Sequence, residues 1–327
     1  MIDDWLLDDI DAMAAGDPSN MLAAVASSGA QMREAVSVID RAALNEVSRG
    51  DQPRNILIAG LGGSGVGGDV LRAVIGQSTP VPIISERSHS LPGWVGPMDV
   101  VVGVSCSGMT EETLSAYHDA KAKGAYCLTV SVGGKMSDLA AADGLLTYRA
   151  EGGYQPRVAF GYPVTYLFLI FAELLGQDIQ SELKEVIEHV SNVEQFKSSS
   201  LAVRNFFKTN IRNKYVIVAS PDMEAVAIRF AQQVQENAKL EAFVVVILEA
   251  NHNVIETYYE QWASNYIFLN SGANASGLAS MPVALADLLA NTMGSVWAWV
   301  SPVVGIFGAF LSGSATFSRP FRMRTGR

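Results

Sequence analysis

The sequence predicts an α/β protein with two domains, each built on a parallel β-sheet that helices cover on both faces. Three observations lead to this fold class. Short, continuous apolar runs alternate with helical segments, which is the pattern of parallel strands buried on both sides. The chain has 327 residues, a length that suits about two domains. Hydrophobic residues make up 49% of it and charged residues 17%, which is enough apolar material for packed cores.

The first α/β domain is expected over residues 51–153, after helices over residues 1–50 that carry no visible chemistry. Hydrophobic spacing at a helical period over residues 21–47 supports those helices. Four apolar runs predict the strands of the domain, at residues 55–60, 81–85, 99–105 and 125–131. Helical patterns fill the gaps between them, at residues 66–76, 110–123 and 135–142.

A glycine-containing loop around residues 150–158 interrupts this alternation, so we expect the domain boundary there. The second domain is then residues 154–267. Mostly helical sequence comes first in it, and the strand and helix rhythm resumes after about residue 210. Strands are predicted at 214–220, 242–248 and 266–269, with helices at 222–238 and 252–262. This domain lacks two or three elements that would balance the first, and we expect it to be incomplete.

Charge and cysteine content narrow the function classes. Asp and Glu number 33 against 23 Lys and Arg, a net charge of −10, which disfavours binding to nucleic acid or other polyanions. Two cysteines, Cys106 and Cys127, supply neither a disulfide framework nor a four-cysteine zinc site. The N-terminus is acidic where a secretory signal would be basic, so a cytoplasmic location is expected.

The last sixth of the chain, residues 268–327, differs in composition from the rest. No charged residue occurs between Asp287 and Arg319, and residues 294–312 are 19 uncharged positions, close to the length that spans a bilayer core. Pro302 and several glycines argue against a plain spanning helix. Two interpretations stay open for this tail: apolar filler that replaces missing core elements, and a segment that seeks a membrane or aggregates.

A glycine-rich loop follows the first predicted strand, at residues 60–69. Its glycines, Gly63 among them, let backbone N–H groups approach an anion at a helix N-terminus, and Ser64 adds a hydroxyl donor. The loop lacks the Gly-Lys-Ser/Thr ending of a P-loop, and Glu86 is poorly placed for a dinucleotide site. The structural alternative is a tight turn that binds nothing.

A second hydroxyl-rich loop follows the strand at residues 99–105. Ser105, Ser107 and Thr110 lie within six residues of each other, and acidic residues occupy the first turn of the next helix. These are the parts of a phosphate cradle, or alternatively of an ordinary helix N-cap. Both loops lie at carboxyl ends of strands in one parallel sheet, where α/β proteins bind ligands. Together they favour a phosphorylated ligand.

Further motifs extend this pattern into a resemblance to a known family. In order along the chain they are the two loops, Gly133-Gly134-Lys135, Gln155-Pro156-Arg157, Gln235-Glu236-Asn237-Ala238-Lys239 and Asn251-His252-Asn253. Over about residues 50–262 the chain resembles the bifunctional phosphoglucose/phosphomannose isomerases, which carry two sugar-isomerase (SIS) domains. The resemblance implies two SIS-type αβα sandwiches and a homodimer. It also implies conversion of glucose 6-phosphate or mannose 6-phosphate to fructose 6-phosphate without a metal or other cofactor.

Site roles follow from the resemblance and from the chemistry of moving a carbonyl between C1 and C2, which needs a base, an acid and an enediolate partner. Glu236 is the candidate base, His252 the acid for ring opening, acting in trans in the family, and Arg157 the enediolate partner. The phosphate would contact Gly63, Ser64, Ser105, Ser107 and Thr110. Without the resemblance, Glu236 is a solvated helix-end acid, His252 a loop or capping residue and Arg157 a surface residue. Lys135 is as well explained by packing at a helix N-terminus as by ligand contact, and Cys106, which has no assigned base, is interpreted as a packing residue.

The resemblance breaks near the C-terminus. The family has a catalytic lysine there, and this sequence has no lysine after Lys239. Residues 268–318 instead resemble L-lactate permease membrane segments, so we expect a foreign tail joined near residues 263–270, with membrane contact not expected of the isomerase body. The tail would impair activity. The alternative function is a non-catalytic SIS module that binds a sugar phosphate.

Overall fold

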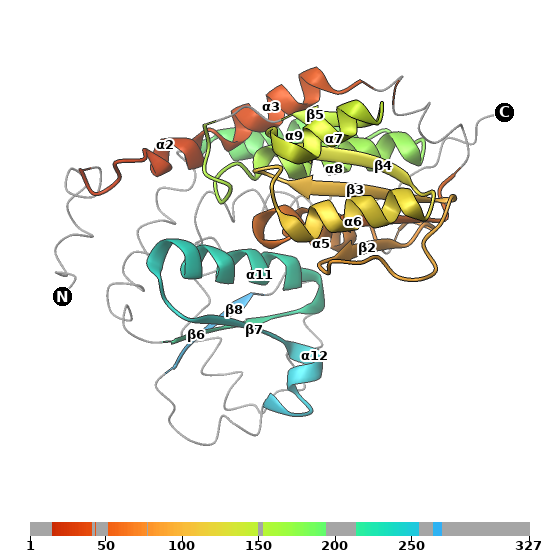
Figure 1. Ribbon diagram of the computed structural model, residues 1–327. Coiled ribbons are helices and arrows are strands. Elements are labelled where there is room, and N and C mark those ends of the chain that lie inside the picture. Colours follow the sequence, from red (N-terminus) through yellow and green to blue (C-terminus); the bar gives the residue numbers. More distant parts are fainter. Residues whose placement is uncertain are drawn as a thin grey trace. The chain divides into compact units, whose positions relative to one another are not determined.

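The computed structural model describes residues 15–40, 43, 52–76, 78–149, 153–193, 214–254 and 264–269 (Figure 1). The predicted tail over 268–327 therefore lies almost wholly outside the described residues, as does the acidic N-terminal segment. The chain divides into two compact units, one over residues 27–191 and another that contains residues 192–269, and each is described by itself. Within the described ranges, no helix combines the length and the apolar character needed to cross a membrane.

A five-stranded parallel sheet forms the centre of the first unit, in the order β2-β1-β3-β4-β5. The strands are β1 (Asn55–Ala59), β2 (Ile83–Glu86), β3 (Asp99–Ser105), β4 (Tyr126–Ser131) and β5 (Leu146–Arg149). Ile58 on β1 is in register with Val102 on β3 and with Ser85 on β2, so β1 has a neighbour on each side. The parallel α/β prediction is confirmed, and the crevice between the carboxyl ends of β1 and β3 is the topological switch point.

Four of the five strands match the predicted runs, whereas β5 has no counterpart in the prediction. Its four residues, Leu-Thr-Tyr-Arg, contain no continuous apolar run and follow a turn in which Gly144 has φ +65°. β5 is one of the two edge strands of the sheet and pairs only with β4 among the described strands. An edge strand needs less apolar sequence than a central one, which explains why the pattern missed it.

The helices between the strands are α5 (Gly62–Ile75), α6 (Glu111–Ala122) and α7 (Gly134–Ala142). Helix α5 begins four residues before the predicted start at residue 66. The prediction missed these residues because Gly-Gly-Ser-Gly resembles a loop and has low helix propensity. Glycine is required at one of them: a Cβ on Gly65 would lie 2.4 Å from the carbonyl oxygen of Gly60. This close approach packs the start of α5 directly against the end of β1.

Helices from both sides of the predicted domain boundary complete the first unit. They are α3 (Ser28–Val38), α8 (Gly161–Leu174) and α9 (Gln180–Ser191), and α3 packs against α8 and α9. The amide of Gln31 joins α3 to the start of α8, since it donates to the Val158 carbonyl at 3.0 Å and accepts from the Gly161 N–H at 3.1 Å. Residues 161–191 therefore pack in the same unit as the first sheet. The predicted boundary at residue 153 between two SIS repeats stays a prediction. A short helix, α2 (Met21–Ala26), precedes α3 in the chain and is grouped with the other unit.

The second unit contains a three-stranded parallel sheet in the order β7-β6-β8. Its described elements are β6 (Lys214–Ala219), the 3₁₀ turn η3 (Pro221–Met223), α11 (Glu224–Gln233), the π-helical turn η4 (Val234–Ala238), β7 (Ala242–Val246), α12 (Ile247–Ala250) and β8 (Ser264–Leu269). The predicted strand at 242–248 is two residues too long, because α12 begins at Ile247, which turns inward and is buried. Most of the predicted helix at 252–262 lies outside the described residues.

Candidate functional site

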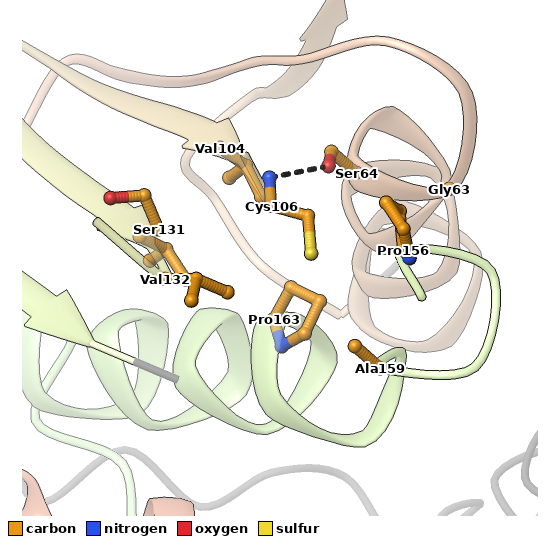
Figure 2. Close-up of a pocket in the computed structure, with 10 residues that line it drawn as sticks. Gly63, Ser64, Val104, Cys106, Ser131, Val132, Pro156, Ala159 and Pro163 are labelled. Carbon is orange, nitrogen blue, oxygen red and sulfur yellow. Dashed lines mark hydrogen bonds between the residues drawn. The ribbon is translucent and has the colours of Figure 1, made fainter. Parts of the chain in front are cut away.

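Two loops meet at the carboxyl ends of β1 and β3. The first loop, residues 60–64, includes the first turn of α5, and the second loop, residues 105–110, leads into α6. The hydroxyl oxygen of Ser64, in the first turn of α5, accepts a hydrogen bond from the backbone N–H of Cys106 at 3.3 Å (Figure 2). The structure thus joins the two loops that the sequence singled out.

The hydroxyls of the second loop are held by the loop itself. Ser105 is buried, and its Oγ lies 2.8 Å from Oγ1 of Thr110 and accepts from the Gly108 N–H at 3.1 Å. Ser107 is exposed, and its Oγ accepts from the Met109 N–H at 3.2 Å. Thr110 is the N-cap residue of α6, yet it makes no side-chain cap hydrogen bond. Its hydroxyl is turned toward Ser105, which argues against the plain N-cap interpretation of this residue.

This arrangement leaves hydroxyl hydrogens available as donors. A serine hydroxyl has one hydrogen to donate and two lone pairs that accept. The Oγ atoms of Ser64 and Ser107 accept from backbone N–H groups, so each keeps its own hydrogen for another partner. In the pair of Ser105 and Thr110 one hydroxyl donates to the other, and the second retains its hydrogen. Hydroxyl donors near the first turns of α5 and α6 suit an anionic ligand.

A small cavity lies beside the joined loops, and its walls come from residues that share no single stretch of sequence (Figure 2). They are Gly63, Ser64, Val104, Cys106, Val130, Ser131, Val132, Pro156, Ala159 and Pro163. The Cys106 sulfur points into this cavity, toward the side where Pro163 lies. Burial raises the pKa of the Cys106 thiol above its usual value, so the thiol stays protonated at neutral pH.

A third loop, residues 131–135, closes the cavity on the β4 side. It was not among the predicted phosphate-binding residues, although Ser131 follows an apolar strand just as Ser105 does. Lys135 is exposed in the first turn of α7, and its backbone N–H contacts Met109 Sδ at 3.4 Å. That repeated position, a serine at the last residue of neighbouring strands, is the signal that could have drawn attention to this loop.

Arg157 lies in a turn directly before α8. The turn is closed by the Gln155 carbonyl, which accepts from the Val158 and Ala159 N–H groups at 2.9 and 3.2 Å. The Arg157 side chain is half-buried, and the neighbouring Pro156 lines the cavity. Arg157 therefore belongs to the same unit as the two hydroxyl-rich loops.

Glu236 lies in the π-helical turn η4 that ends α11, and it is half-buried. The turn closes at Lys239, which has a left-handed backbone with φ +56° and whose Nζ donates to the Glu236 carbonyl at 2.6 Å. Gln235 Nε2 donates to the Ala242 carbonyl at 2.7 Å, which fixes the turn to the start of β7. π-Turns within helices are rare and occur often at functional sites. The turn was not predicted, since nothing in its residue types distinguishes it from an α-helical end.

A buried cation lies two helical turns before Glu236. Arg229 on α11 is fully buried, and burial lowers its pKa to about 10, while the Glu236 carboxylate opposes this shift. Gln232 accepts a hydrogen bond from Arg229 Nη1 at 3.3 Å. The carboxylate of Glu236 thus has a positive charge within its electrostatic reach, from a residue that the sequence motifs did not highlight.

His252 lies on the turn after α12 and is exposed. Its backbone N–H donates to the Glu249 carbonyl at 3.0 Å. The hydroxyl-rich loops and Arg157 belong to the first unit, whereas Glu236 and His252 belong to the second. Their assembly into one site stays a prediction. Among the described residues, no three His, Cys, Asp or Glu side chains gather as metal ligands would.

The fold is that of phosphosugar isomerases and related SIS proteins. It matches the tagatose-6-phosphate ketose/aldose isomerase from Escherichia coli with a TM-score of 0.65 at 15% identity, over 92% of this chain and 91% of that one. It also matches the C-terminal domain of glucosamine-fructose-6-phosphate aminotransferase from Francisella tularensis, with a TM-score of 0.66 at 13% identity, over 93% and 97% of the two chains. At these identities the likeness concerns the fold alone.

The sequence comparisons name a particular family. Residues 206–296 match the family model of the bacterial phospho-glucose isomerase C-terminal SIS domain. The chain is 37% identical to the bifunctional phosphoglucose/phosphomannose isomerase of Caldicellulosiruptor bescii over 207 residues, 61% of each chain. It is 33% identical to the enzyme of the same name from Thermoplasma acidophilum, over 61% of this chain and 60% of that one. The resemblance inferred from the motifs is confirmed.

These matches also bear on the length of the similarity. The chain spans about 61% of the length of the first of these curated relatives. The family-model match continues to residue 296, past the predicted junction at 263–270. A further relative has another activity in its name: the D-glucosamine-6-phosphate 4-epimerase of Sulfolobus acidocaldarius, 33% identical over 64% of this chain and 65% of that one.

Proposed function

We propose that this chain is an aldose-ketose isomerase that interconverts glucose 6-phosphate or mannose 6-phosphate with fructose 6-phosphate. The observation that carries the proposal is the hydrogen bond between Ser64 and Cys106, which joins two hydroxyl-rich loops at the switch point of the sheet. The similarity to bifunctional phosphoglucose/phosphomannose isomerases supports the same reaction.

The phosphate group would bind between the first and second loops. Ser64 and Ser107 each retain a hydroxyl hydrogen, and the pair of Ser105 and Thr110 retains one more. Three donors from two loops, close to the first turns of two helices, can surround a dianion from several sides. Gly63 leaves the approach to the α5 N-terminus free of a side chain.

Glu236 is the proposed proton-transfer base. In the forward direction its carboxylate takes the proton from C2 of the open-chain aldose and forms an enediolate. It then returns this proton to C1 while the hydroxyl proton on O2 passes to O1, which gives the ketose. No oxidant or other reactant is consumed. Arg157 would hold the enediolate oxygens, because a guanidinium offers paired donors to two neighbouring oxygens. Arg229, a buried cation whose charged form the Glu236 carboxylate favours, adds a positive charge to the surroundings of this proposed base.

His252 is the proposed acid and base for ring opening, and we propose that it acts in the neighbouring subunit of a homodimer. Its side chain is exposed, as a residue that reaches another subunit would be in a single chain. Two large apolar side chains nearby in the sequence, Phe243 on β7 and Leu248 on α12, are each more than half exposed. Apolar side chains of this size are typical of a buried subunit contact.

The test is a coupled assay that follows fructose 6-phosphate formation from glucose 6-phosphate and from mannose 6-phosphate, with the full chain. Glucosamine 6-phosphate, assayed for loss of the starting epimer, tests the activity named for the Sulfolobus relative. Fructose 6-phosphate formation that disappears in E236Q supports the proposal. Sugar-phosphate binding by calorimetry without turnover on any substrate contradicts it and favours the non-catalytic SIS module.

A further inference from the structure

The third loop and the second loop touch each other through two glycines. A Cβ on Gly108 would lie 1.7 Å from the Gly133 carbonyl oxygen, and a Cβ on Gly134 would lie 2.5 Å from the Ser107 carbonyl oxygen. Both glycines also have positive φ, +66° for Gly108 and +71° for Gly134. Any side chain at either position would therefore push the two backbones apart.

Backbone hydrogen bonds also join the second and third loops. The Val132 N–H donates to the Cys106 carbonyl at 3.0 Å, and the Met136 N–H donates to the Gly108 carbonyl at 2.9 Å. These bonds fix the second loop at two points, on either side of Ser107. The shape of the second loop is thus set in part by residues that follow β4.

Two buried serines hold the third loop in turn. Ser131 Oγ donates to the Gly133 carbonyl at 3.1 Å and lies 2.6 Å from Ser137 Oγ, and both side chains are almost fully buried. Ser131 has a single hydrogen, which the Gly133 carbonyl receives, so Ser137 must be the donor in the pair. The order of the bonds is therefore fixed: Ser137 donates to Ser131, and Ser131 donates to Gly133.

The contacts form one continuous path to the phosphate loop. Ser137 donates a hydrogen bond to Ser131, and Ser131 donates one to the Gly133 carbonyl. That carbonyl packs on Gly108. The Gly108 N–H donates to Ser105 Oγ, the hydroxyl that pairs with Thr110. A change at Ser137 would therefore reach Ser105 through polar groups that are buried, apart from the half-buried Gly133, and have little freedom to rearrange.

We propose that Ser131 and Ser137 are positioning residues of the phosphate site, acting through Gly133 and Gly108 on the hydroxyl of Ser105. This inference rests on the proposed function, since it assumes that Ser105 faces a phosphate. Neither serine is proposed to touch the substrate. They keep the second loop in the conformation in which its hydroxyl hydrogens are available to an anion.

The test compares S137A with the wild-type chain, using inorganic phosphate as the probe. We expect the phosphate dissociation constant and the KM for glucose 6-phosphate to rise together by about fivefold, the effect of one hydrogen bond, while kcat stays within twofold. S137C keeps a weak donor on a somewhat larger side chain, so it should fall between the two and replaces S137A if alanine prevents folding. T165A is the matched control, because it removes a buried hydroxyl that donates to the Gly161 carbonyl at 2.7 Å within α8. It should leave phosphate binding unchanged.

A second readout separates this inference from the proposed function. Amide hydrogen exchange at Gly108, measured by NMR without any substrate, should become faster in S137A and stay as in the wild type in T165A. Faster exchange with weaker phosphate binding supports the positioning role even if the chain shows no isomerase turnover. Unchanged exchange at Gly108, or phosphate affinity in S137A within the error of the wild type, overturns it, as does a wild-type chain that fails to bind phosphate.

Discussion

Ser64 Oγ accepts a hydrogen bond from the backbone N–H of Cys106 at 3.3 Å. The Ser64 side chain thus joins the first turn of α5 to the loop before α6. The bond uses an oxygen lone pair and leaves the hydroxyl hydrogen available. Ser64 therefore has two roles: it connects two loops, and it offers a donor to the ligand. A single substitution at Ser64 removes both.

The first prediction follows from that double role. S64A should raise the KM for the sugar phosphate by about tenfold or more, because a hydrogen bond to a charged group contributes about 1.5–3 kcal/mol. The measurement is steady-state kinetics together with inhibition by inorganic phosphate. S78A is the control at the other end of the helix, where the Ser78 hydroxyl donates to the Ile75 carbonyl. Equal KM values for S64A and the wild type would contradict the role of Ser64.

The second prediction concerns the base. E236Q preserves the size of the side chain and removes its ability to accept a proton, so kcat should fall about 10²- to 10⁴-fold. Binding of inorganic phosphate, measured by calorimetry, should be retained because the phosphate loops belong to the other unit. E241Q is the matched control: Glu241 is exposed and pairs with Lys214 at 3.0 Å. Turnover in E236Q close to that of the wild type would rule out Glu236 as the base.

The third prediction compares two neighbouring glycines in α5. A Cβ on Gly68 would lie 3.0 Å from Ile58 Cβ and 2.9 Å from Ser85 Oγ, atoms fixed in the sheet. A Cβ on Gly67 would meet only the end of the Leu167 side chain, at 2.9 Å. Alanine gains about 1 kcal/mol of helix propensity at either position.

We therefore expect the free energy of unfolding of G67A to lie within about 1 kcal/mol of the wild-type value, since the Leu167 methyl group can move. The free energy of unfolding of G68A should be lower than that of the wild type by about 1–3 kcal/mol, because the cost of overpacking against the sheet exceeds the gain in helix propensity. Urea unfolding of both variants measures the difference. A G68A chain as stable as G67A would mean that α5 shifts away from the sheet without cost.

The fourth prediction is a pH dependence of stability. Burial alone would raise the pKa of Asp99, but hydrogen bonds from Arg54, Asn55 and the Gly96 N–H outweigh it and hold the pKa below its usual value. The unfolded state has a pKa of about 3.9. A lowered folded-state pKa contributes stability that is complete above the unfolded value and is lost as pH falls through the folded value.

The free energy of unfolding of the wild type should therefore fall steeply below about pH 4. D99N should be less stable than the wild type by about 1–3 kcal/mol at neutral pH and should show a shallower fall in acid. The measurement is urea unfolding at a series of pH values, with D138N, an exposed position on α7, as the control. Parallel pH profiles for D99N and the wild type would contradict this prediction.

Physical reasons explain which parts of the fold and site the sequence could predict. Strand β3 was predicted with its observed bounds because all seven of its residues are buried and residues 100–104 between its polar ends, Asp99 and Ser105, form a continuous apolar run. The start of α5 was not, because Gly65 is there for a close approach to the Gly60 carbonyl oxygen and Gly62 has a positive φ of +53°, and helix propensity misses both requirements. The contact of Gly108 with Gly133 joins residues 25 positions apart, and no local pattern encodes it.

The site shows the same division. Ser105 and Thr110 could be predicted as neighbours because they flank one loop, and their hydroxyls lie 2.8 Å apart. The bond from Ser137 to Ser131 could not, because serines after a strand are common and only the packed structure shows that both are buried. The relation of Glu236 to the phosphate loops depends on how the two compact units are arranged, which motif order alone does not determine.

The last prediction tests His252 across subunits. If His252 completes the site of the neighbouring subunit, the E236Q and H252A chains should each be nearly inactive alone. When the two are mixed and subunits exchange, each mixed dimer has one intact site, formed by Glu236 of the H252A chain and His252 of the E236Q chain. Random exchange at equal amounts makes half of the dimers mixed, so about a quarter of the wild-type activity should return. Mixing E236Q with itself is the control and should restore nothing. Exchange demonstrated with labelled chains, but without any recovery of activity, would show that His252 serves its own chain or has no part in the reaction.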